Sequence, residues 1–161
     1  MSAIGLEALI GRETRKLKAY LDSVGVYTIG IFHTAAAGAP IPYRVLTITR
    51  EECDAIFARD TIQYEDAVRR ALKVPVADHL FDELTSVCYN IGTGGPAGSS
   101  FIKLINAGAS PAQIRAAILA WKKPSEILPR RTAEADQFQT PYEVRLPKAR
   151  STDSAPIKIA A

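Results

Sequence analysis

Apolar positions along the first twenty residues recur at the spacing of one helix face. Counted at about 100° per residue, four of them fall within about 40° of one direction: Leu6, Ile10, Leu17 and Tyr20. The pattern predicts a helix over residues 4–20. The following stretch, "VYTIGIFHT", is rich in β-branched and aromatic residues and predicts one or two short strands that include Gly30.

The pattern from residue 50 onward is helical. Thr49 and Glu52 form a capping box, which predicts a helix over about 50–59. The segment "DTIQYEDAVRRALK" predicts a second helix, which ends before Pro75. The segment "ADHLFDELTSVCYNIG" carries an apolar stripe and ends at Gly92, so we expect the most buried helix there.

Three further segments complete the expected secondary structure. "FIKLINAG" predicts a helix that ends at Gly108, and Ser110–Pro111 provides the N-cap and first position of another. Trp121 is expected to point into the core. A last helix is expected over about 130–138, and residues 141–161 show no periodicity, so we expect an extended or disordered tail.

Composition limits the class of protein only loosely. With 161 residues, 47% hydrophobic and 23% charged, the chain is typical of a globular protein with one domain or two small lobes. The net charge of +3 favours an anionic partner, and leaves nucleic acid, a membrane surface and a cell-wall polymer open. Cys53 and Cys88 lack a CxxC spacing and are expected to be buried free thiols.

One carboxylate lies on the apolar side of the first predicted helix. Glu13 falls about 20° from Leu6, whereas Arg15 falls on the opposite side, so we expect the cations to face water and the acid to face inward. A carboxylate among apolar groups is stable only when it is paired or protonated. Periodicity leaves two interpretations open, a general acid for catalysis or a buried acid that serves stability alone.

Two further polar residues follow where the chain turns back. Asp22 lies in a turn and Thr28 lies on the first predicted strand. A chain that folds back over the helix end brings a second carboxylate and a hydroxyl near Glu13. Two acids in unlike environments are the usual arrangement for hydrolysing a glycosidic bond.

These residues carry a resemblance to a known family. The spacing E-x8-D-x5-T resembles the catalytic signature of phage-type lysozymes, glycoside hydrolase family 24. "LKAYLDSVGVYTIG", "FDELTSVCYNIGTG", "SSFIKLINAG" and "PRRTAEA" are similar to four segments of that family in the same order, and span residues 10–135. The resemblance implies an α+β, mainly α, lysozyme-like fold over 1–140, with a small antiparallel sheet lobe at about 10–60 and a helical lobe at about 61–140.

The resemblance also implies residue roles. Glu13 would be the general acid, and Asp22, helped by Thr28, would hold the attacking water. The substrate would be the β-1,4 bond between N-acetylmuramic acid and N-acetylglucosamine, cleaved with inversion by carboxyls roughly 6.5–9.5 Å apart. Arg131 matches a position whose guanidinium lies near the catalytic Glu, and His33 is expected to hold its strand by bonding a neighbouring carboxylate or carbonyl.

Two positions depart from the family pattern. The family usually has Gly after the catalytic Glu, where this chain has Thr14. The family's "T-I-G-x-G-H" reads "TIGIFHT" here, so Phe32 replaces a glycine, and its ring could stack on a sugar, narrow the cleft or block it. A blocked cleft would leave a peptidoglycan-binding or structural module. A lytic transglycosylase is a further alternative, against which Asp22 and Thr28 argue.

The resemblance therefore implies an endolysin-type muramidase that acts on peptidoglycan strands as a monomer. No cofactor, metal or nucleic acid is expected, since His79 beside Asp78 and Asp82 is interpreted as a solvated first helical turn. The N-terminus lacks a basic region followed by a long apolar core, so neither a signal peptide nor a membrane anchor is expected. The protein would be made in the bacterial host cytoplasm and act on the wall after release.

Overall fold

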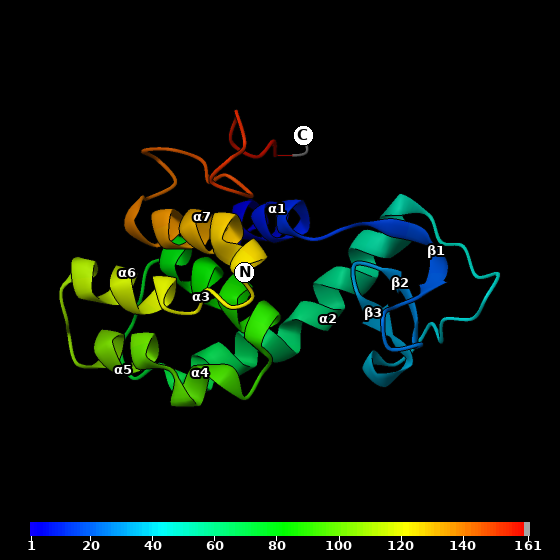
Figure 1. The fold of residues 1–161 in the computed structure, drawn as a ribbon, viewed down its shortest axis with the longest axis horizontal. Coiled ribbons are helices and arrows are strands. Elements are labelled where there is room, and N and C mark those ends of the chain that lie inside the picture. The colour runs from blue at the N-terminus through cyan, green and yellow to red at the C-terminus, as the bar shows by residue number, and fades with distance from the viewer. Residues whose placement is uncertain (160–161) are drawn as a thin grey trace. The chain divides into compact units, whose positions relative to one another are not determined.

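The computed structural model describes residues 1–159, and Figure 1 shows its course. Within these residues it has seven α-helices, two short 3-10 helices and one sheet of three strands. The chain forms two compact units, one made of Glu13–Ile62 and the other of Met1–Arg12 together with the chain from Gln63 onward. None of the helices within residues 1–159 is both long and apolar enough to cross a bilayer.

The smaller unit is built on an antiparallel sheet in the order β1-β2-β3. The strands are β1 (Lys16–Leu21), β2 (Tyr27–Gly30) and β3 (His33–Thr34), followed by the 3-10 helix η1 (Ala35–Ala37). In the register, Tyr20 lies opposite Thr28, and Ile29 lies opposite His33. The strands expected in "VYTIGIFHT" are thus confirmed as β2 and β3.

The helix predicted over 4–20 is wrong beyond residue 12. Helix α1 (Ala3–Arg12) ends eight residues early, and the chain continues as β1. Leu17, one of the apolar residues that suggested the helical stripe, is 36% exposed, and the neighbouring Leu21 is 56% exposed, whereas Ala19 is buried. Pairing with β2 satisfies the backbone of this segment, and that tertiary contact overrides the helical spacing of a short apolar pattern.

A single helix replaces the two that were expected between residues 50 and 74. Helix α2 (Arg50–Ala71) runs from the smaller unit into the larger one. The predicted capping box is confirmed, because the backbone N–H of Glu52 donates to Thr49 Oγ1 and the Glu52 carboxylate accepts from the Thr49 N–H. No residue between 59 and 62 is Gly or Pro, so nothing in the local chemistry breaks the helix.

The larger unit packs helices around α3 (Asp78–Ile91), which contacts α1 and α7 (Leu128–Gln139) (Figure 1). The remaining elements are α4 (Gly95–Gly98), α5 (Ser100–Asn106), α6 (Pro111–Leu119) and the 3-10 helix η2 (Ser125–Ile127). The core combines apolar side chains from α2, α3, α5, α6 and α7: Ala67, Val68, Leu84, Val87, Cys88, Phe101, Ile102, Ile105, Ile114, Ile118, Ala135 and Phe138. Cys53 and Cys88 are buried free thiols, as expected.

The helix ends of this unit follow the sequence signals. Gly92 and Gly108 take left-handed φ angles of 85° and 68° after α3 and α5. Ser110 caps α6 in a capping box with Gln113. Trp121 is the exception, because it is 37% exposed, although its ring makes a T-shaped contact with the Phe101 ring. The expectation that Trp121 points into the core is therefore wrong.

The C-terminal segment, residues 141–159, has no helix or strand but is held against the helices. The Ser151 N–H donates to the Pro129 carbonyl, and the Ile157 N–H donates to the Pro147 carbonyl. Pro147 and Ala149 are buried. The division at residue 140 between domain and tail stays a prediction, and residues 160 and 161 of that expected tail lie outside the described part of the chain.

Candidate active site

Glu13 is the first residue after α1. Its side chain is half-buried, and the exposed Thr14 follows it on the way to β1. The helical argument that placed Glu13 inward and the neighbouring cations outward is wrong, because Glu13 is not on a helix and Arg12 is only 3% exposed. The position of Glu13 is therefore decided by where α1 ends, and not by a helix face.

Asp22 lies in the tight turn that joins β1 to β2. Its Oδ1 accepts hydrogen bonds from the N–H groups of Val24 (2.9 Å) and Val26 (2.8 Å). Gly25 supplies the left-handed φ of 81° that the turn needs. Two backbone donors on one oxygen fix the direction of the carboxylate, and Oδ2 has no hydrogen-bond partner within residues 1–159.

Thr28 and Tyr20 lie directly opposite each other on β2 and β1. Thr28 is fully buried, and its Oγ1 donates to the Val26 carbonyl at 3.2 Å. Burial raises the pKa of the Tyr20 phenol, and the negative charges of Asp22 and Glu13 raise it further. Both carboxylates thus act on one phenol, although they are nine positions apart in the sequence.

Lys16 adds a positive charge to the same group of residues. Its Nζ lies 3.8 Å from the centre of the Tyr20 ring, a distance typical of a cation–π contact. The sequence analysis missed Lys16 and Tyr20 as site residues. The signal that could have pointed to Tyr20 was its position in the "LKAYLD" segment, two residues before Asp22.

The hairpin between β2 and β3 carries Phe32 and His33. Phe32 has a φ of 59°, in the left-handed region, and is 54% exposed. This conformation costs a bulky side chain about 1–2 kcal/mol. His33 is 1% exposed, with Nδ1 2.6 Å from Asp60 Oδ2 and Nε2 2.8 Å from the Pro40 carbonyl oxygen. His33 therefore makes both of the bond types expected for it, and anchors the hairpin to α2 and to the loop at Pro40.

Arg131 belongs to the other unit, in α7. Its Nε donates to the Trp121 carbonyl at 2.9 Å, one terminal nitrogen pairs with Glu134, and the other donates to Asn90 Oδ1 at 2.5 Å. The side chain is 1% exposed. Its expected place beside Glu13 stays a prediction.

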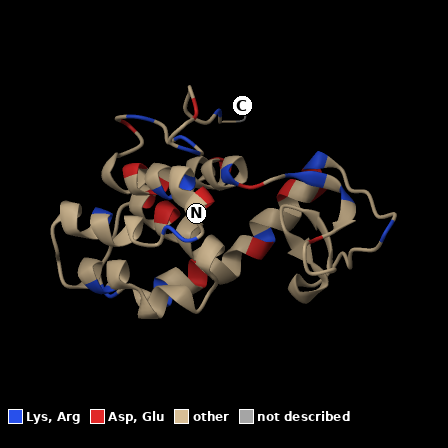
Figure 2. Ribbon diagram, viewed as in Figure 1, with Lys and Arg blue, Asp and Glu red and all other residues tan. Residues whose placement is uncertain are grey.

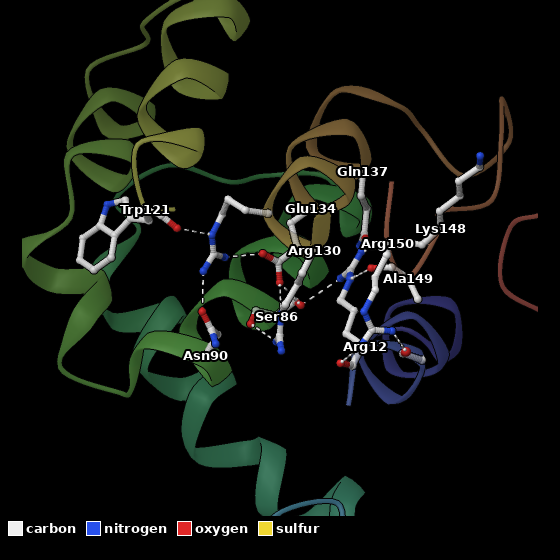
Figure 3. Close-up of polar contacts among 12 residues, drawn as sticks. Arg12, Ser86, Asn90, Trp121, Arg130, Glu134, Gln137, Lys148, Ala149 and Arg150 are labelled. Carbon is white, nitrogen blue, oxygen red and sulfur yellow. Dashed lines mark hydrogen bonds and ion pairs between the residues drawn. The ribbon is translucent and has the colours of Figure 1, made fainter. Parts of the chain in front are cut away.

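Arg131 is part of a buried polar network that the sequence analysis did not foresee. Arg12 donates to Ser86 Oγ at 2.9 Å, and Ser86 Oγ donates to Glu134 Oε1 at 2.6 Å (Figure 3). Arg130 Nε also donates to Glu134 Oε1, at 3.0 Å. Charges of both signs therefore lie along α7, as Figure 2 shows. Within "RRTAE", the spacing of three and four residues between two cations and an acid was the available signal.

The three guanidinium groups decide the ionisation of Glu134. Burial alone would raise its pKa, but Arg130, Arg131 and Arg12, with the Ser86 hydrogen bond, outweigh burial and lower it. Burial lowers the pKa of Arg12, against the opposing pull of Glu134. No group of three or more His, Cys, Asp and Glu within residues 1–159 could hold a metal ion.

Comparisons with known proteins find relatives that cover most of this chain. The family model described as "Phage lysozyme" matches residues 11–134. An endolysin of Salmonella phage P22 is 34% identical over 142 residues, covering 86% of this chain and 97% of its own. A SAR-endolysin of Escherichia phage 933W is 32% identical over 98 residues, covering 60% of this chain and 55% of its own.

Solved structures give the same result. A mutant of P22 lysozyme has a TM-score of 0.80 at 33% identity, covering 87% of this chain and 98% of that one. An endolysin from Escherichia coli O157:H7 phage FAHEc1 has a TM-score of 0.78 at 34% identity, covering 85% and 91%. The observed mixture of helices with a small antiparallel sheet matches the fold of both.

Proposed function

This chain belongs to the phage lysozyme family, and we propose that Glu13, Asp22 and Thr28 carry its catalytic chemistry. The protein is a peptidoglycan-hydrolysing muramidase of the endolysin type. Glu13 protonates the oxygen of the β-1,4 bond that leaves N-acetylmuramic acid. Asp22 and Thr28 hold the water that attacks the anomeric carbon from the opposite side, which inverts its configuration.

One observation carries this assignment. The charges of Glu13 and Asp22 both raise the pKa of Tyr20, so the two acids lie within electrostatic reach of one side chain. Tyr20 is also the cross-strand partner of Thr28. Glu13, Asp22 and Thr28 are thus grouped around one tyrosine, which supports a shared role in a two-carboxylate mechanism.

The two acids lie at different kinds of position in the chain, Asp22 in a turn and Glu13 directly after a helix. Asp22 is fixed by two backbone donors on Oδ1, so its carboxylate has a set direction for holding a water. Glu13 is half-buried at the end of α1. Both carboxylates are half-buried, and in this proposal Glu13 donates the proton while Asp22 holds the water.

Phe32, His33 and Arg131 support the site in this proposal. His33 holds the β2–β3 hairpin through Asp60 and the Pro40 carbonyl. The exposed Phe32 ring at the hairpin offers a flat apolar face on which a sugar ring could stack. The pairing of Arg131 with Glu13 is part of the proposal.

The test compares Glu13→Gln with wild type on purified peptidoglycan, measured by the release of reducing ends. We expect a loss of about 10²–10⁴-fold, because an amide cannot donate the required proton. Glu126→Gln, which alters an exposed acid on η2, is the matched control and should keep full activity. Release of reducing ends that survives Glu13→Gln would remove Glu13 from the mechanism.

Two product analyses test the reaction type. NMR of freshly released glycans should show the α-anomer at the new reducing end, because inversion of a β-bond gives the α-product. Mass analysis should show hydrated muramic acid ends. Anhydro ends would assign the protein to the transglycosylases, and binding of peptidoglycan without any cleavage would favour a binding module.

We infer further that the protein acts as a monomer on glycan strands, and that it reaches the wall from the host cytoplasm with outside help. Its relatives include proteins named SAR-endolysin. Sedimentation at micromolar concentration tests the oligomeric state. Fractionation of cells that express the protein tests its route, since lysis without a co-expressed membrane-permeabilising protein would contradict the need for help.

A further inference from the structure

Two arginines join the C-terminal segment to helix α1. Arg12 of α1 donates to the segment, and Arg150 of the segment donates to the end of α1. From α1, the Arg12 guanidinium donates to the carbonyl oxygens of Ala149 (3.4 Å) and Lys148 (3.3 Å). From the segment, the Arg150 guanidinium donates to the carbonyl oxygens of Gly11 (3.3 Å) and Arg12 (3.0 Å). Figure 3 shows the two side chains beside each other at the end of α1. We call residues 148–150 the C-terminal clamp.

The clamp supplies what the end of a helix lacks. The last carbonyl groups of an α-helix have no partner within the helix, and a cation near them is favoured by the helix dipole. Arg150 provides both the hydrogen bonds and the positive charge. It caps the Gly11 and Arg12 carbonyls at the point where α1 stops and the chain changes to an extended course.

Close packing leaves this contact little freedom. A Cβ placed on Gly11 would lie 3.1 Å from the Ala149 Cβ, so the Ala149 side chain of the clamp lies directly against α1. Arg12 is also held by helices α3 and α7, because it donates to Ser86 Oγ and to Gln137 Oε1. The end of α1 is therefore fixed from the helical core on one side and from the clamp on the other.

The Arg12 carbonyl belongs to the peptide bond between Arg12 and Glu13. That peptide group is planar, so a hydrogen bond to its oxygen also restrains the orientation of the Glu13 backbone N–H and Cα. We propose that the clamp positions the general acid, with Arg150 acting as a positioning residue through the Arg12 carbonyl. This inference rests on the proposed role of Glu13. The clamp lies beyond residues 11–134 that match the family model.

The proposal has a kinetic consequence. A general acid works only when its proton lies within hydrogen-bond reach of the leaving oxygen, and a displacement of about 1 Å can cost as much as 100-fold in rate. Loss of the Arg150 contacts should therefore lower kcat. KM should stay nearly unchanged, because Arg150 touches no group that we assign to substrate binding.

The experiment measures kcat and KM of the full chain on soluble, uncrosslinked glycan strands. We expect Arg150→Gln to lower kcat about tenfold and to change KM less than twofold. Arg150→Lys retains the charge near the carbonyls and should recover part of the rate. Arg145→Gln removes the same charge from the same segment, at a side chain that makes no hydrogen bond within residues 1–159, and should match wild type.

A second variant separates positioning from stability. Ile157→Ala removes packing near Gly11 without removing a donor to the Arg12 carbonyl. If Arg150→Gln loses kcat at a temperature where it is folded, while Ile157→Ala keeps kcat at a similar Tm, the clamp positions Glu13. A wild-type kcat in Arg150→Gln, or an equal loss of kcat in Arg150→Gln and Ile157→Ala, would overturn the proposal that the clamp positions Glu13. A fully active Glu13→Gln would instead overturn the proposed function.

Discussion

Substitution of Glu83 by Gln should make the protein progressively more stable than wild type as pH rises. Glu83 lies on α3 and is fully buried, and neither carboxylate oxygen has a hydrogen-bond partner within residues 1–159. Burial, and next the negative charge of Glu134, raise the pKa of Glu83 well above its usual value. Arg131 and Arg12 pull this pKa down, but burial wins.

The sign and size of this stability difference between Glu83→Gln and wild type follow from proton linkage. The folded state keeps the Glu83 proton at pH values where the unfolded chain has released it. Stability from this group is fully present below the usual carboxyl pKa and is lost as pH rises toward the folded pKa. Within that window the unfolding constant changes tenfold per pH unit, so two units amount to about 3 kcal/mol. Gln has nearly the same size and cannot ionise, which removes this loss.

The assay is urea unfolding of both proteins at pH 5, 6, 7 and 8. It is followed by fluorescence of Trp121, the single tryptophan, which lies in the same unit as Glu83. The free energy of unfolding of Glu83→Gln minus that of wild type should increase across the series. Glu126→Gln, at an exposed acid, should show no such trend. A difference that is flat or falls with pH would refute the reasoning.

Three further predictions concern stability. Phe32→Gly should be about 1 kcal/mol more stable than Phe32→Ala, because only glycine adopts the observed φ of 59° without strain, and thermal unfolding compares the two. Asp60→Asn should lower the free energy of unfolding by about 2 kcal/mol, because the buried His33 loses a charged hydrogen-bond partner. Denaturant unfolding measures this change, and a decrease of less than about 0.5 kcal/mol would contradict the importance of the contact. Gly5→Ala should lower Tm, because its Cβ would lie 2.2 Å from Asp82 Cγ, and an unchanged Tm would show that Asp82 moves freely.

The helix caps, and the spacing of the residues proposed for catalysis, were readable from the sequence. Thr49 with Glu52, and Ser110 with Gln113, satisfy backbone groups only three residues away, so the information is local. The sequence also contained the Glu13, Asp22 and Thr28 signature, although the reason first given for Glu13, its place on a helix face, was wrong.

Tertiary contacts decided the course of residues 16–21 and the conformation of the β2–β3 hairpin. Residues 16–21 became β1 because β2 lies beside them, and a short apolar pattern does not reveal its partner. Phe32 keeps its left-handed backbone conformation because the buried His33 next to it holds the hairpin through Asp60 and the Pro40 carbonyl.

The buried ionisable side chains of Arg12, Glu83 and Glu134 likewise depend on α1, α3, α7 and the C-terminal clamp coming together. The energy of a buried charge is set by groups that are distant in sequence and close in space. The sequence by itself therefore determined the family and the helix caps, and it supplied the residues that we propose for catalysis. Only the tertiary structure decided which charged side chains are buried and what holds the residue before Glu13 in place.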